Sequence, residues 1–141
     1  MRAVSMSEDA ARRWRWRAVA LSMAAGLVHI VVSPLYFTQC IGYGAFFVTV
    51  ATLQGIGAMA LTASEPHRFF YWAGIVGNAA VVLIWLITRT VGIPFFGPAA
   101  GEVQPVGVPD LVATLLELAL IAHLAVLVAK FGELKKEPLI D

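Results

Sequence analysis

The sequence predicts an all-α integral membrane protein, a four-helix bundle that forms one transmembrane domain over residues 1–141. Hydrophobic residues make up 60% of the chain, charged residues only 13%, and the mean hydropathy is +0.81. A soluble chain of this length could not cover so much apolar surface with polar groups. No charged residue lies between Arg17 and Glu65, which leaves room for two crossings of about 20 residues each. Two more apolar runs follow, so we expect four spanning helices.

The first pair of helices is expected over residues 18–37 and 43–62. Arginines alternate with tryptophans over residues 12–17, a pattern that suits the headgroup layer of a membrane. We do not expect a cleaved signal peptide, because no small-x-small site separates the first apolar run from a polar domain. Pro34 lacks a backbone N–H, which predicts that the first helix either kinks or ends early.

The third helix is expected over residues 69–88, after a short polar turn that predicts an antiparallel hairpin with the second. Tyr71, Asn78 and Trp85 follow one another at heptad spacing. Residues at this spacing share a helix face. We therefore expect these three side chains to point into the bundle.

Residues 89–110 form a loop rich in proline and glycine before the fourth helix, expected over residues 111–129. Fixed φ angles at proline and the apolar character of the loop predict a folded lid that docks on the mouth of the bundle. Asp110 follows a proline and is expected to be the N-cap of the fourth helix.

This region also carries a resemblance. The motif Arg-Thr-x-Gly-x-Pro begins at Arg89, Pro-Val-Gly-x-x-Asp ends at Asp110, and a glutamate follows at Glu117. The combination resembles an uncharacterised group of small four-helix bacterial membrane proteins. The resemblance implies no activity and assigns no functional residue.

The basic residues predict the orientation of the chain. Most of them flank the expected helices on one side: Arg2, Arg12, Arg13, Arg15, Arg17, Arg68, Lys130, Lys135 and Lys136. Only Arg89 falls on the other side. Because lysine and arginine are enriched in cytoplasmic segments, we expect both termini inside, with the turn at Cys40 and the loop outside. The expected location is the inner (plasma) membrane of a bacterium.

Polar side chains inside apolar runs are the chemical candidates, because they are costly in lipid unless paired. They are His29, Gln54, Asn78, Glu117 and His123. From the rise per residue of a helix, we expect all of these except Glu117 to share one layer. Glu117 is expected nearer the outer boundary, paired with Arg89 or with a donor from the loop.

Three functions are compatible with these residues. The first is a non-catalytic accessory or interaction subunit, whose partners are lipid and other membrane subunits or a second copy, and not nucleic acid. The second is electron transfer by a haem b bound between His29 and His123. The third is proton- or cation-coupled transport centred on Glu117. An enzyme is not expected, since Glu117 and His123 lie about 120° apart around their helix, and two histidines are too few for a metal site.

Overall fold

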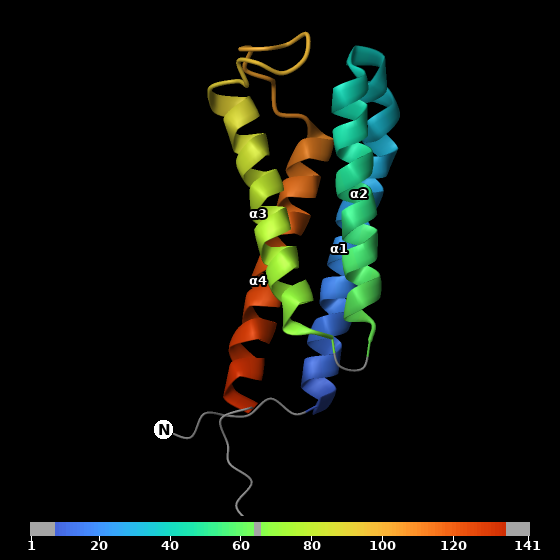
Figure 1. Ribbon diagram of the computed structural model, residues 1–141, viewed down its shortest axis with the longest axis vertical. Coiled ribbons are helices and arrows are strands. Elements are labelled where there is room, and N and C mark those ends of the chain that lie inside the picture. Colours follow the sequence, from blue (N-terminus) through green and yellow to red (C-terminus); the bar gives the residue numbers. More distant parts are fainter. Residues whose placement is uncertain (1–7, 64–65, 135–141) are drawn as a thin grey trace, which may run out of the picture.

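The computed structural model describes residues 8–63 and 66–134, and within them four helices: α1 (Glu8–Gln39), α2 (Ile41–Leu61), α3 (Arg68–Thr90) and α4 (Val108–Leu134). They stand side by side as one bundle (Figure 1). All four are long and apolar enough to cross a membrane. This confirms the all-α, four-helix prediction, and the chain fits a multi-pass membrane protein.

Helix α1 runs without a break past Pro34 to Gln39, so of the two expected outcomes the early end is wrong. A proline leaves the carbonyl four residues earlier without its helical donor, here that of Ile30. The Ser33 hydroxyl donates a hydrogen bond to this carbonyl oxygen at 2.9 Å. The side chain thus replaces the missing N–H.

The helices surround the bundle axis in the order α2, α1, α4, α3. Helix α1 packs most extensively against α2, then against α4, and α3 packs against α4. Helices α2 and α3 run antiparallel, as the hairpin prediction requires, but they share few contacts. The bundle is therefore least tightly packed between α2 and α3.

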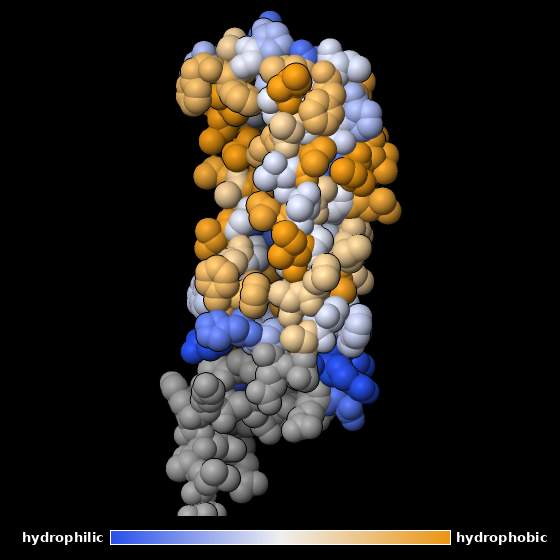
Figure 2. Space-filling model, turned by 45° about the vertical axis from the view of Figure 1, so that its right-hand side comes forward, coloured by the Kyte–Doolittle hydropathy of each residue, from blue (hydrophilic) through white to orange (hydrophobic). Residues whose placement is uncertain are grey.

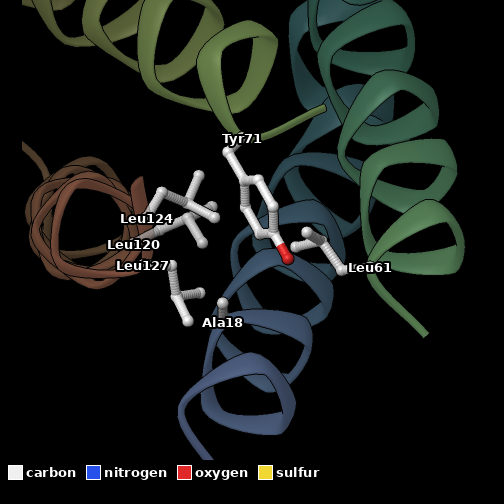
Figure 3. Packing of buried hydrophobic residues seen from close by; sticks show 6 residues of the cluster. All are labelled: Ala18, Leu61, Tyr71, Leu120, Leu124 and Leu127. Carbon is white, nitrogen blue, oxygen red and sulfur yellow. The ribbon is translucent and has the colours of Figure 1, made fainter. Parts of the chain in front are cut away.

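A hydrophobic core closes the end of the bundle at which α1 begins and α4 ends. Side chains from all four helices meet there: Ala18, Leu61, Tyr71, Leu120, Leu124 and Leu127. The Tyr71 ring lies between the leucines of α4 and Leu61 of α2 (Figure 3). Tyr71 and Asn78 are both buried, which confirms the inward face predicted for α3.

The outer surface of the helices is apolar. Large hydrophobic side chains are exposed on every helix, for example Val31, Met59, Val76 and Leu115. On the face drawn in Figure 2, hydrophobic residues cover most of the length of the helices, and hydrophilic residues gather near the two ends. Such a surface suits contact with lipid tails.

The segment between α3 and α4 folds back over the end of the bundle opposite the core (Figure 1). Three of its turns use glycines with positive φ: Gly92, Gly97 and Gly101. The Gln104 N–H donates to the Thr88 carbonyl at 2.9 Å and returns the loop to α3. The Tyr43 hydroxyl of α2 donates to the Phe96 carbonyl at 3.0 Å and accepts from the Ala99 N–H at 3.3 Å. These bonds hold the loop against both sides of the bundle.

Candidate functional site

Each helix contributes one buried polar side chain to a layer across the middle of the bundle: His29 from α1, Gln54 from α2, Asn78 from α3 and Glu117 from α4. His29 Nε2 lies 2.9 Å from Glu117 Oε1. The Gln54 amide nitrogen donates to the same carboxylate oxygen at 3.4 Å and to Asn78 Oδ1 at 3.2 Å. The layer is one hydrogen-bonded network that links all four helices.

The network extends into the backbone on both sides. The Asn78 amide donates to the Gly74 carbonyl at 2.7 Å, and the Ser22 hydroxyl donates to the Gln54 carbonyl at 2.8 Å. Buried polar groups are tolerated only when hydrogen-bonded. The bond to Gly74 fixes the rotamer of Asn78, which in turn accepts a hydrogen bond from the Gln54 amide, and the Ser22 bond ties α1 to the backbone of α2.

Glu117 does not pair with Arg89, contrary to our expectation. Arg89 Nη2 instead donates to Asp110 Oδ2 at 2.6 Å, and both side chains are largely buried. Glu117 lies seven residues after Asp110 on α4, about 10 Å deeper in the bundle at 1.5 Å per residue. Arg89 lies in the last turn of α3, at the depth of Asp110, and therefore pairs with Asp110 rather than with Glu117.

Asp110 is not the N-cap of α4, since the helix already begins at Val108. Asp110 is the third helical residue, and its Oδ2 accepts a hydrogen bond from the Gly107 N–H at 3.0 Å. A side chain at this position that reaches back to the residue before the helix is half of a capping box. The Tyr36 hydroxyl adds a long bond of 3.4 Å to the other oxygen, Oδ1.

The contacts of α1 with α4 repeat along the helices. His29 meets Glu117, and Tyr36, seven residues later on α1, meets Asp110, seven residues earlier on α4. Because seven residues are two helical turns, the two polar contacts lie about 10 Å apart along the bundle. The His29–Glu117 contact lies at the middle of the bundle and the Tyr36–Asp110 contact lies nearer the loop, so the two contacts define one side wall formed by α1 and α4.

A cavity of about 290 Å³ opens beside this wall, between the outer halves of the helices and under the loop. His29 and Glu117 lie at its deep end, and Asp110 lies near the loop. Its lining is mainly apolar, and six of the lining residues are aromatic: Tyr36, Tyr43, Phe46, Phe47, Trp85 and Phe96. The Tyr36 and Phe47 rings stack with centroids 4.2 Å apart.

Two buried nitrogen atoms of cavity-lining residues have no hydrogen-bond partner among residues 8–63 and 66–134. They are His29 Nδ1 and Trp85 Nε1. Leaving a buried donor unsatisfied costs about 1–3 kcal/mol.

His123 lies elsewhere. Its Nδ1 hydrogen-bonds to the Ala119 carbonyl at 2.8 Å, and its ring contacts the Trp14 ring with centroids 4.6 Å apart. His123 does not line the cavity that His29 lines, and His29 Nε2 is occupied by Glu117. The described residues thus do not bring the two histidines to one cavity, and this geometry does not favour a haem between them.

Sequence reasoning missed the cavity and most of its lining. Trp85 was expected to point inward, and it does line the cavity. Tyr36, Tyr43 and Phe47 were not expected to act together, although their spacing at the ends of two successive helices places aromatic rings at one level. The aromatic residues can be seen in the sequence, but only the packing of α1 against α2 shows that they line one cavity.

Comparison of the chain with protein families, with curated proteins and with solved structures finds no match.

Proposed function

We propose that this protein binds a small, mostly apolar molecule inside its bundle, in the cavity between the polar layer and the loop. One observation carries the proposal: the bundle encloses a cavity of about 290 Å³ whose lining is mainly apolar and aromatic, with His29 and Glu117 at its deep end. Well-packed protein interiors contain few voids larger than a water molecule. A space of this size and lining is suited to a small, mostly apolar ligand.

Size and chemistry support the proposal. Ligand sites are typically apolar cavities of about 300–1,000 Å³ with a few convergent polar groups, and the volume of about 290 Å³ lies just below that range, which favours a small ligand. Sparse contacts between α2 and α3 are consistent with entry of a lipophilic molecule from the bilayer. The ligand would reach the cavity without passing the tight core at the other end.

Native mass spectrometry of the full-length protein, released gently from its own membrane, tests this proposal. We expect a population that carries one extra small-molecule mass. Ala113 is buried and lines the cavity, so Ala113→Phe should fill the space and abolish the adduct. Ala45 is exposed on α2, so Ala45→Phe adds the same volume toward lipid and should keep the adduct.

Two results would contradict ligand binding in this cavity. One is a native protein of bare polypeptide mass under conditions that preserve ordinary lipid adducts. The other is an adduct that survives Ala113→Phe as well as it survives Ala45→Phe, since that molecule would sit on the outer surface.

We also propose that both termini face the cytoplasm, and the single cysteine of the chain allows a direct test. Cys40 lies at the turn between α1 and α2 and is half-buried. A membrane-impermeant maleimide should label it in intact cells. In the Cys40→Ala/Ala63→Cys variant, the thiol moves to an exposed residue at the opposite turn, and labelling should require permeabilised cells. The reverse pattern would invert the topology.

The three functions considered from the sequence, an accessory subunit, coupled transport and haem binding, remain predictions alongside ligand binding. An accessory subunit is compatible with ligand binding, because the cavity is internal and leaves the lipid-facing surface available to partner helices. Co-purifying chains would support that role. Coupled transport centred on Glu117 predicts a flux that Glu117→Gln alters, and haem binding predicts a visible spectrum that His29→Ala abolishes.

A further inference from the structure

We infer that the seam between α1 and α4, at the end of the bundle that holds the hydrophobic core, binds the phosphate headgroup of an anionic phospholipid. The seam is formed by Trp14 and Arg17 of α1 and by His123 and Lys130 of α4. These four side chains do not line the cavity. The seam is therefore a second site, at the surface of the bundle.

A chain of ring contacts joins the two helices at the seam. The Trp14 and His123 rings lie with centroids 4.6 Å apart, and the His123 imidazole is fixed by its hydrogen bond to the Ala119 carbonyl. The exposed Arg17 side chain lies over the Trp14 ring, with its guanidinium carbon 5.9 Å from the centroid. A guanidinium that lies over an aromatic face keeps N–H groups at its edge for a phosphate.

Lys130 lies at the same depth as Arg17. The contact between His29 and Glu117 sets the register of α1 against α4. Arg17 lies 12 residues before His29, and Lys130 lies 13 residues after Glu117, so both are about 18–20 Å from that contact along the bundle. Lys130 follows His123 by seven residues and shares its side of α4. Two cations therefore flank the seam at one level.

The charge at this end of the bundle calls for an anion. The acidic side chain described there, Asp9, lies 3.6 Å from Arg12. Arg17 and Lys130 form no ion pair with any side chain that the structure describes. A phosphate between them would offset the repulsion of two like charges at one level. The basic side chains described at this end are Arg12, Arg13, Arg15, Arg17, Arg68 and Lys130.

The position of the seam along the bundle selects a lipid over a free phosphate. Exposed aromatic side chains surround the same end: Trp16, Phe69 and Trp72. Such residues lie at the headgroup level of a membrane, and basic pockets between spanning helices at this level bind anionic headgroups. Farther along α1, Leu27 and Val31 are exposed. They offer an apolar surface to the acyl chains of a lipid whose phosphate lies in the seam.

The test is a titration of the delipidated full-length protein in detergent, read by native mass spectrometry. The probes are phosphatidylglycerol and, as the zwitterionic comparison, phosphatidylcholine with the same acyl chains. The Arg17→Gln/Lys130→Gln variant removes two charges at the seam. Its matched control is Arg12→Gln/Arg68→Gln, which removes two charges at the same end. Arg12 lies about 160° around α1 from Trp14, and Arg68 begins α3.

We expect one phosphatidylglycerol to bind the native protein about tenfold more tightly than phosphatidylcholine. Each basic side chain at a charged membrane surface strengthens binding roughly fivefold. The seam variant should therefore lose about tenfold or more in affinity for phosphatidylglycerol, and the control should stay within about twofold of the native protein. Arg17→Lys/Lys130→Arg keeps both charges and should keep most of the affinity. Unchanged binding of phosphatidylcholine checks that each variant is folded.

Three outcomes would overturn the site. Equal losses in the seam variant and in its control would mean that affinity follows net charge alone. Equal affinities of the native protein for the two lipids would mean that the headgroup charge is not recognised. Equal losses in the seam variant and in Arg17→Lys/Lys130→Arg would mean that the two cations do not act through their charge.

Discussion

Replacing Glu117 by alanine should lower the free energy of unfolding by about 2–3 kcal/mol, the largest loss expected from any single polar side chain here. Glu117 is 1% exposed and hydrogen-bonds with two helices, with α1 through His29 and with α2 through Gln54. Its removal leaves the buried His29 Nε2 without its partner and leaves the Gln54 amide with only its bond to Asn78. The measurement is equilibrium unfolding in mixed micelles with an increasing fraction of denaturing detergent.

The expected loss of about 2–3 kcal/mol lies between the typical free energies of two kinds of interaction. Interhelical hydrogen bonds in membranes average only about 0.6 kcal/mol, whereas breaking a buried ion pair costs about 3–5 kcal/mol. Glu117→Gln keeps one acceptor oxygen and the side-chain shape, so we expect it to lose about half as much as Glu117→Ala. Thr52→Ala is the control, because the Thr52 hydroxyl is exposed and bonds only within α2.

Coupling between His29 and Glu117 gives a second readout. If the two side chains act as a pair, the His29→Ala/Glu117→Ala double variant should lose clearly less stability than the sum of the single variants. Strict additivity, or a Glu117→Ala protein as stable as the Thr52→Ala control, would show that the polar layer does not hold the helices together.

Replacing Asp110 by alanine should lower the free energy of unfolding by about 2 kcal/mol and expose the loop over residues 91–107 to protease. Asp110 accepts hydrogen bonds from Arg89, from the Gly107 N–H and from Tyr36. Its loss removes the cap of α4 and leaves the Arg89 guanidinium with a hydrogen bond to Thr88 but without its carboxylate partner. The measurement combines the same unfolding titration with the rate of loop cleavage in reconstituted protein.

Arg89→Ala should cost less than Asp110→Ala, because the bond from Gly107 to the Asp110 carboxylate remains. Asp110→Asn separates the two contributions, since it keeps an acceptor for the Gly107 N–H but loses the charge. We expect its stability to lie between those of the native protein and Asp110→Ala. Equal cleavage rates for the native and Asp110→Ala proteins would refute the role of this pair in holding the loop.

The His29–Glu117 and Arg89–Asp110 contacts should also influence ligand binding in the cavity. The His29–Glu117 pair lies at its deep end, and the Arg89–Asp110 pair braces the helix that carries the loop. A variant that weakens the upper pair should loosen the cover of the cavity while leaving the deep network intact. Ligand affinity and loop protection are therefore expected to change together in Asp110→Ala.

Several features of this protein follow from its sequence alone. The number of helices follows from composition and run length, because an apolar stretch of spanning length satisfies its backbone hydrogen bonds only as a helix when lipid is the solvent. The inward face of α3 follows from heptad spacing, since Tyr71 and Asn78 are buried as predicted. These are local properties, and they do not depend on which helix is the neighbour.

The partners of the polar residues were decided by tertiary structure. A sequence states that Glu117 needs a partner, but Arg89, a loop donor and His29 all satisfy that need. The relative depth of α1 and α4 selects His29, and it sends Arg89 to Asp110. The same depth places His123 beside Trp14 and away from the cavity. A shift of one helical turn moves a side chain by about 5.4 Å, more than the reach of a hydrogen bond, so only the packed register of the four helices could join these groups into one site.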